Sequence, residues 1–251
     1  MFGAGPLTFR MIEPFRRWAV TFDGTARDTS AADQIAGRDD AGTRIPLKYE
    51  IEMEMVAPSW VQDLSPEKVA LMSPREQDDA RSMGIGWRLE QVFRASGTLT
   101  VDGETRSFRG VGNRIKRQSV RPLDGFRGHV WQAACFPDGR AFALCTYPPA
   151  ADGSTYNDAY IYQDGVMHVA HAARIPWLRR LMPRGDDASL DLVSDLGVAQ
   201  IRGTTEFATF RVNNQEMGGF TLQQGGAHYE WDGQEAFGMI ERSAFASQIE
   251  G

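Results

Sequence analysis

The chain has 251 residues, 42% of them hydrophobic and 24% charged, which is typical of a folded protein with one large domain or two smaller ones. Its formal charge of −6, from 27 Lys and Arg against 33 Asp and Glu, argues against broad nucleic-acid binding. No apolar run approaches the about 20 residues that span a bilayer. Residues 1–14 lack the pattern of a secretory signal, so we expect a soluble, cytoplasmic protein.

The dipeptide Asp-Gly is the strongest structural signal. Type I′ hairpin turns need positive φ at both central residues, which Asp tolerates and Gly adopts freely. Several of the pairs separate short alternating segments rich in Val, Thr, Phe, Tyr and Trp, which indicates antiparallel strands. The seven pairs begin at Asp23, Asp102, Asp124, Asp138, Asp152, Asp164 and Asp232.

The first half of the chain predicts strands and one helical segment. Residues 25–43 show no periodicity, which predicts a loop. Residues 65–83 start with Ser65-Pro66-Glu67 and continue with mixed charge, so we expect a short polar helix or a lid-like excursion between strands. Residues 96–110 around Asp102-Gly103 predict a hairpin.

The overall pattern is many hairpins with at most two helices. It favours an all-β sandwich or barrel over alternating βαβ units. Pro and Gly cluster near residues 121–128, which predicts a boundary between two β domains, residues 1–124 and 125–251.

Residues 129–147 predict a hairpin around Asp138-Gly139. With a two-residue loop, Cys135 would lie opposite Phe142 and Cys145 opposite Gln132. The cysteines would then point to opposite sheet faces and could not pair. The same register would place one set of side chains on a single face, as an interior wall: Trp131, Ala133, Cys135, Phe142 and Leu144.

Two further hairpins are predicted around Asp164-Gly165 and Asp232-Gly233. In the second, a two-residue loop would set Glu230 against Glu235. Because like charges directly opposite each other are unfavourable, either this loop is longer or the pair binds a cation.

Residues 106–121 carry six cations and no acid. In an acidic protein such a segment can bind a carboxylate or a phosphate. Alternatively, it is a solvated strand and loop in which Arg serves solubility. Both interpretations stay open at this point.

The same segment carries a family resemblance. Gly110-x-Gly112-x-Arg114, followed by Ser119 and Arg121, resembles the Gly-x-Gly-x-Arg-Asp-His-Ser-Trp-Gly-x-Arg segment of the hydroxyneurosporene-synthase-like family, which includes carotenoid 1,2-hydratases and AttH-type proteins. Further similar stretches occur in the same order: residues 14–18, 22–24, 90–91, 96–97, 101–103, 136–139 and 238–241. The resemblance implies tandem lipocalin-like β-barrels or curved sheets that bind isoprenoid-like or polyketide-like molecules. It also implies acid-catalysed hydration or rearrangement in a dry pocket.

The chain departs from this family at two places. Residues 115–118 are Ile-Lys-Arg-Gln where the family has Asp-His-Ser-Trp, so the family's acid and imidazole cannot be carried over. The family also has further strands ahead of the equivalent of residues 14–18. The first barrel is therefore expected to be short, with an edge that self-association or a partner subunit could cover.

Glu90 and Glu241 are the candidate catalytic acids. A carboxyl group facing an apolar interior has its pKa raised by desolvation, which suits a proton donor. The alternative is structural, with either acid paired to an Arg such as Arg88 or Arg114.

Five other residues are candidate contacts to the substrate. Arg114 and Lys116 would hold an anionic group, and the remaining three are Arg121, Trp131 and His228. His168 and His171 are three apart, which on a strand places them on opposite faces. Without Cys or carboxylate at ligand spacing we expect no metal, and no motif predicts another cofactor.

Residues 174–184 mix Trp, Leu and Met with four Arg. This mixture suits a shallow contact with a membrane surface, or an irregular loop between strands.

Two hypotheses for function follow. The chain is a cofactor-independent hydratase (a lyase), cyclase or isomerase that acts on an apolar substrate in a barrel-like pocket. Alternatively, it is a non-catalytic module that binds an apolar ligand or assembles with a partner subunit.

Overall fold

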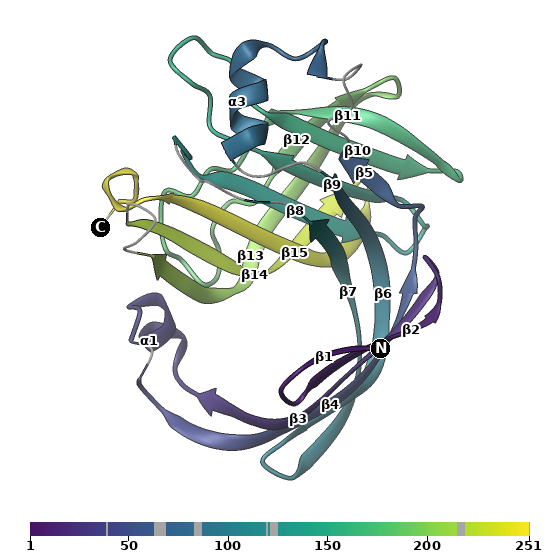
Figure 1. The fold of residues 1–251 in the computed structure, drawn as a ribbon, viewed down its shortest axis with the longest axis vertical. Coiled ribbons are helices and arrows are strands. Elements are labelled where there is room, and N and C mark those ends of the chain that lie inside the picture. The colour runs from purple at the N-terminus through teal and green to yellow at the C-terminus, as the bar shows by residue number, and fades with distance from the viewer. Residues whose placement is uncertain are drawn as a thin grey trace.

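The computed structural model describes residues 1–38, 40–62, 69–82, 87–118, 120, 125–214 and 219–250. The chain forms a curved, open sheet of seven antiparallel strands, here called the N-terminal sheet, and a closed barrel of eight (Figure 1). The predicted fold of mainly antiparallel barrels and curved sheets is confirmed.

The N-terminal sheet has the strand order β1-β2-β3-β4-β6-β5, and β7 pairs with the other side of β6. Its β6 is long enough to pair with β4 through one half and with the short β5 through the other. The strands are β1 (Phe2–Ala4), β2 (Leu7–Glu13), β3 (Arg17–Asp28), β4 (Thr43–Met55), β5 (Trp60–Gln62), β6 (Trp87–Val101) and β7 (Glu104–Gln118).

The N-terminal sheet does not close into a barrel. Its two ends are β1, which is only three residues long, and β7. From β7 the chain continues into the barrel, and β7 lies against β8 and β15 there. The covering of the open edge by a partner or a second copy stays a prediction.

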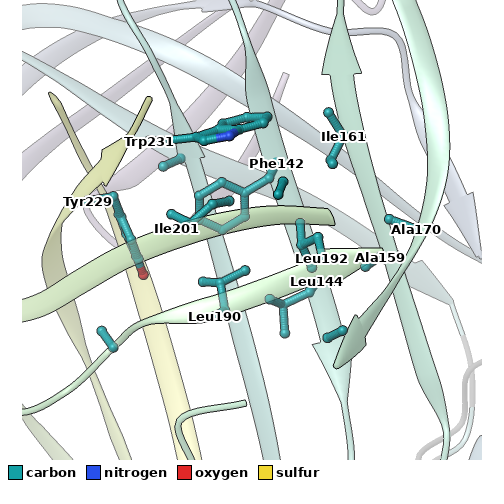
Figure 2. Packing of buried hydrophobic residues seen from close by; sticks show 14 of the residues in the cluster. Phe142, Leu144, Ala159, Ile161, Ala170, Leu190, Leu192, Ile201, Tyr229 and Trp231 are labelled. Atoms are coloured by element: carbon teal, nitrogen blue, oxygen red, sulfur yellow. The ribbon is translucent and has the colours of Figure 1, made fainter. Parts of the chain in front are cut away.

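The barrel closes in the order β10-β11-β12-β13-β14-β15-β8-β9. Its strands are β8 (His129–Cys135), β9 (Ala141–Thr146), β10 (Asn157–Gln163), β11 (Val166–Arg174), β12 (Leu190–Ser194), β13 (Gly197–Asn214), β14 (Phe220–Trp231) and β15 (Gln234–Phe245). Large apolar side chains from opposite walls meet inside it, among them Phe142, Leu190 and Tyr229 (Figure 2). The expected hollow interior is therefore wrong for this barrel, which has a packed core.

Three Asp-Gly pairs form the predicted two-residue turns. Asp102, Asp164 and Asp232 have φ of 48°, 51° and 49°, and the glycine after each is also at positive φ. The flanking residues pair directly, as in Val101 with Glu104. Not every pair is a turn, because Asp23-Gly24 lies within β3. Asp124 lies outside the described residues.

The loop around Asp138-Gly139 differs from the prediction by one residue. Phe136 N–H donates to Arg140 O at 2.8 Å, which closes a three-residue loop starting with Pro137. Pro137 has no N–H to give to a strand ladder. The register therefore shifts, and Trp131 lies opposite Cys145.

This shift corrects two predictions. Cys135 and Cys145 lie on the same sheet face, and both are buried free thiols. The residues of the predicted interior wall lie on both faces of the sheet. Phe142 and Leu144 point into the barrel core, whereas Trp131 points out towards the N-terminal sheet, where it meets Glu90.

Glu230 and Glu235 do lie opposite each other across a two-residue loop. Glu230 forms an ion pair with Arg202 of the neighbouring strand, and His228 lies 3.6 Å from Glu235. The Arg202 guanidinium therefore offsets the repulsion at Glu230, so neither a longer loop nor a bound cation is required.

In the described residues, two helices lie between the strands. The predicted loop at residues 25–43 contains α1 (Ala31–Ile35), and β3 and β4 extend into it at either end. The predicted polar helix is α3 (Pro74–Ser82); the expected start at Ser65 lies outside the described residues. A 3-10 turn, Ala246–Gln248, follows β15. None of the helices in the described ranges has the length and apolar content to cross a bilayer.

Residues 174–184 leave β11 as an irregular segment. Ile175 and Trp177 pack against the barrel core, and Leu178 is buried. Because these apolar side chains are used internally, the loop interpretation is favoured over a membrane contact.

Candidate functional site

An apolar cavity of about 640 Å³ lies against the N-terminal sheet. This volume is within the range of small-molecule sites. Nine of its twelve lining residues are apolar: Phe2, Phe9, Met11, Phe15, Trp18, Met53, Leu89, Phe93 and Ile115. The other three, Asn113, Arg114 and Lys116, are consecutive or nearly so on β7.

Strand pairing explains the apolar wall. Met11, Trp18 and Met53 lie opposite one another on β2, β3 and β4, so their side chains share one face of the sheet. Trp18 and Met53 are buried, whereas Phe2 and Phe15 are 66% and 58% exposed. The cavity is therefore deepest at β3 and β4 and open at the β1–β2 hairpin.

Gly112 of the Gly-x-Gly-x-Arg segment makes room for one wall of the cavity. Phe93 lies opposite it on β6, and a Cβ at Gly112 would come within 2.4 Å of Phe93 Cζ. At Gly110 a Cβ would meet no atom within 4 Å. A side chain at the second glycine would therefore displace the Phe93 ring from this wall, whereas a Cβ at the first would contact nothing within 4 Å.

Arg114 provides a positive charge inside this apolar wall. Its guanidinium lies 4.2 Å from the centroid of the Trp18 ring, a cation–π distance. Burial lowers the pKa of Arg114, and no neighbouring carboxylate of the described chain offsets that effect. Trp18 itself is 6% exposed, and its Nε1 has no hydrogen-bond partner among the described residues.

Glu90 lies behind the cavity, at the junction with the barrel. Its side chain is fully buried and forms an ion pair with Arg88. Oε2 accepts hydrogen bonds from Asn113 Nδ2 at 2.6 Å and from Trp131 Nε1 at 2.9 Å. Glu90 therefore connects a cavity residue to the barrel wall.

Arg88 completes this buried cluster. It donates to Gln62 Oε1 at 3.0 Å and lies over the Trp131 ring. Burial alone would lower the pKa of Arg88, but the Glu90 carboxylate together with Cys145 and Tyr147 outweighs burial, and the pKa is raised. The contacts are those of the structural alternative for Glu90, with Arg88 as its partner.

Glu241 belongs to a separate group on the outer face of the barrel. Its Oε1 lies 2.7 Å from His129 Nε2, and its Oε2 accepts a hydrogen bond of 2.7 Å from Gln224. His129 Nδ1 is in turn 2.7 Å from Ser243 Oγ. Glu241 is the cross-strand partner of Trp131, so both candidate acids flank this tryptophan from different elements.

Of the seven predicted site residues, the structure places only Arg114 and Lys116 in the lining of the cavity. Glu90 lies one hydrogen bond away from it, and Trp131 lies beyond Glu90. His228 is on an exposed outer face beside Glu235. Arg121 lies outside the described residues.

The aromatic and Met lining was not predicted as a site. The sequence does contain a signal for this lining, because apolar residues occupy every second position in two segments: Leu7, Phe9 and Met11, and Trp18, Val20 and Phe22. Alternation alone does not say that these two strands and β7 surround a single space. Across the described ranges, no three His, Cys, Asp or Glu side chains group as metal ligands do.

Residues 1–246 match the family model DUF7064, a domain of unknown function. A search of curated proteins finds no match. Among solved structures, an AttH-like protein from Nitrosomonas europaea is similar, with a TM-score of 0.56 and 14% identity, over 93% of this chain and 67% of that one. Kievitone hydratase from Nectria haematococca aligns at a TM-score of 0.44 and 10% identity, over 93% and 81%.

The similarity to the AttH-like structure establishes the fold. The tandem lipocalin-like architecture implied by the resemblance is thereby confirmed, with one unit open and the other closed. At 14% identity this similarity extends to the fold alone.

Proposed function

We propose a function for this chain, which belongs to the DUF7064 family of domains of unknown function, from the cavity that its N-terminal sheet forms. It binds an apolar small molecule, isoprenoid-like or polyketide-like, between the β1–β2 hairpin and β7. The observation that carries this proposal is the apolar lining, nine of twelve residues around about 640 Å³. Open apolar surface of this kind on a folded protein marks a binding site.

The contacts of Glu90 favour binding without catalysis. Arg88 engages one carboxylate oxygen, while Asn113 and Trp131 donate to the other. All three contacts come from donor groups, so the arrangement suits an acceptor that links the sheet to the barrel. Glu241 is not part of the cavity lining.

A catalytic form is the second candidate. It rests on the 2.6 Å hydrogen bond by which Asn113, a lining residue, reaches Glu90. In this form the cavity supports cofactor-independent hydration, cyclisation or isomerisation. Incubation with a panel of terpenoid and polyketide alkenes tests it, because hydration adds the mass of one water and the other two reactions change retention time without changing mass. If the E90Q variant makes every product that the parent chain makes, Glu90 takes no part in catalysis.

Binding can be measured directly with N-phenyl-1-naphthylamine, a neutral apolar fluorophore. The Met11→Asp variant places a charge in the apolar wall and should weaken binding by about tenfold or more. Ile12→Asp is the matched control, because Ile12 is the next residue, is also exposed and is not part of the lining. Equal loss in both variants, or no saturable binding by the unmodified chain, would contradict the proposal.

We also propose a cytoplasmic location. The two thiols, Cys135 and Cys145, are free, in keeping with a reducing compartment.

A further inference from the structure

We propose that the cavity selects an apolar molecule that carries one anionic group, a carboxylate or a phosphate monoester, and that Arg114 and the indole N–H of Trp18 hold this group. The inference rests on the proposed binding function and specifies its ligand class. It is carried by two polar groups in one apolar cavity: a cation that no carboxylate of the described residues neutralises, and an indole N–H without an acceptor in the described residues.

The first group is the Arg114 guanidinium. It is half-buried beside Trp18 and carries a positive charge that no carboxylate of the described chain compensates. Burying an uncompensated charge is unfavourable, so such groups in proteins are paired or bind a counter-charge. Elsewhere in the N-terminal sheet, the buried Arg88 follows this rule through Glu90.

The second group is Trp18 Nε1. The residue is more than nine-tenths buried, lines the cavity, and its N–H is without an acceptor in the described parts of the chain. Buried donors are satisfied in the great majority of cases. An acceptor brought by the ligand would satisfy this one.

The two groups are held close together. Arg114 lies over the face of the Trp18 ring at 4.2 Å, which restrains the guanidinium and leaves the indole N–H at the ring edge. A guanidinium presents several donors in a planar fork that fits a carboxylate or phosphate. Lys116, two residues along β7, adds a second positive charge to the same lining.

Asn113 adds a hydrogen-bond acceptor to the polar wall. Its Nδ2 donates to Glu90, while its Oδ1 has no hydrogen-bond partner among the described residues. The polar wall therefore carries cationic side chains, and no Asp or Glu belongs to the described lining. This balance favours an anion over a neutral or cationic head group.

The test compares three ligands with the same twelve-carbon chain: dodecanoate, dodecyl phosphate and 1-dodecanol. Affinities are measured below the micelle concentration, by displacement of the neutral fluorophore from the full chain. We expect at least one anion to bind about tenfold or more tightly than the alcohol, because charge-assisted hydrogen bonds contribute on that scale. The carboxylate and phosphate arms then show which anion is preferred.

Arg114→Gln should remove this preference, because it should lower the affinity for the anion by about tenfold more than the affinity for the alcohol. Arg109→Gln is the matched control. It removes the same charge from an exposed position on the same strand, so the preference should persist. Trp18→Phe keeps an aromatic ring and removes the N–H, and it should lower anion affinity more than alcohol affinity. It provides an independent variant if Arg114→Gln does not fold.

The outcomes separate the two proposals. Equal binding of anion and alcohol, or an anion preference that survives both Arg114→Gln and Trp18→Phe, overturns the present inference while the cavity remains a binding site. If none of the three ligands displaces the fluorophore, or the fluorophore itself does not bind, the proposed function is overturned.

Discussion

Glu90 is the residue on which the junction between sheet and barrel depends. Its carboxylate contacts Arg88 and Asn113 of the N-terminal sheet and Trp131 of the barrel, with no exposure to solvent. Removing one member of a buried ion pair leaves the other charged and unpaired, which costs more than the pair contributes.

We therefore expect Glu90→Gln to lower the free energy of unfolding by about 3 kcal/mol or more. Urea unfolding measures the change. The control is Glu52→Gln, which removes the same charge from an exposed pair with Arg17 and should cost less than about 1 kcal/mol. A Glu90→Gln variant as stable as its parent would show that the cluster is not a structural tie.

The two glycines of the Gly-x-Gly-x-Arg segment should respond differently to the same substitution. Gly112→Ala would force its Cβ into the Phe93 ring, 2.4 Å from Cζ, and overpacking of this kind costs about 1–3 kcal/mol. Gly110→Ala meets no atom within 4 Å and is the matched control. Thermal unfolding of both variants and their fluorophore affinities test this, and equal behaviour of the two would contradict the packing role of Gly112.

At the scale of elements, α3 is anchored rather than free to act as a lid. Ser73 and Glu76 form a capping box at its start, with Ser73 N–H donating to Glu76 Oε2 at 2.6 Å and Glu76 N–H donating to Ser73 Oγ at 3.2 Å. Arg127 donates to both oxygens of the buried Asp79 at 2.7 Å. The helix is thus held to the segment that leads into β8.

Asp79→Asn should loosen α3 without unfolding the barrel, since Arg127 would lose its carboxylate partner. Hydrogen exchange of residues 74–82 should rise while that of the barrel strands stays unchanged. Asp78→Asn is the control, because the neighbouring Asp78 pairs with Arg81 in an exposed position. If α3 exchanges at the parent rate in Asp79→Asn, the ion pair does not hold the helix.

Local turn chemistry made much of the fold predictable. Asp-Gly at residues 102, 164 and 232 encodes two-residue turns because both residues adopt positive φ. The prediction failed at residue 138 because Pro137 lengthens the loop. Asp23-Gly24 is not a turn, because pairing with β4 carries β3 straight through it. Local sequence does not report such tertiary pairing.

The site was predictable only in its polar part. Arg114 and Lys116 stand out in sequence as cations in an acid-free segment of an acidic chain. The apolar lining comes from residues 2–18 brought against residues 53, 89–93 and 115. Their convergence depends on the register of six strands. The packed core of the barrel depends on which face each strand turns inward.

At the scale of the whole molecule, the two units differ in how their apolar side chains are arranged. The barrel is closed and filled by its own side chains (Figure 2), and the N-terminal sheet is open with an apolar cavity. A filled barrel resists the entry of a ligand because interiors are packed to crystal-like density. We therefore expect ligand binding to require an intact N-terminal sheet.

Photo-crosslinking with an alkyl diazirine, followed by peptide mass spectrometry, tests this central claim most directly. The account predicts labelling that saturates, that excess dodecanoate suppresses, and that maps to residues 2–18 and 89–116. Saturable labelling inside the barrel, at strands such as β9 or β12, or labelling that no competitor reduces, would contradict it.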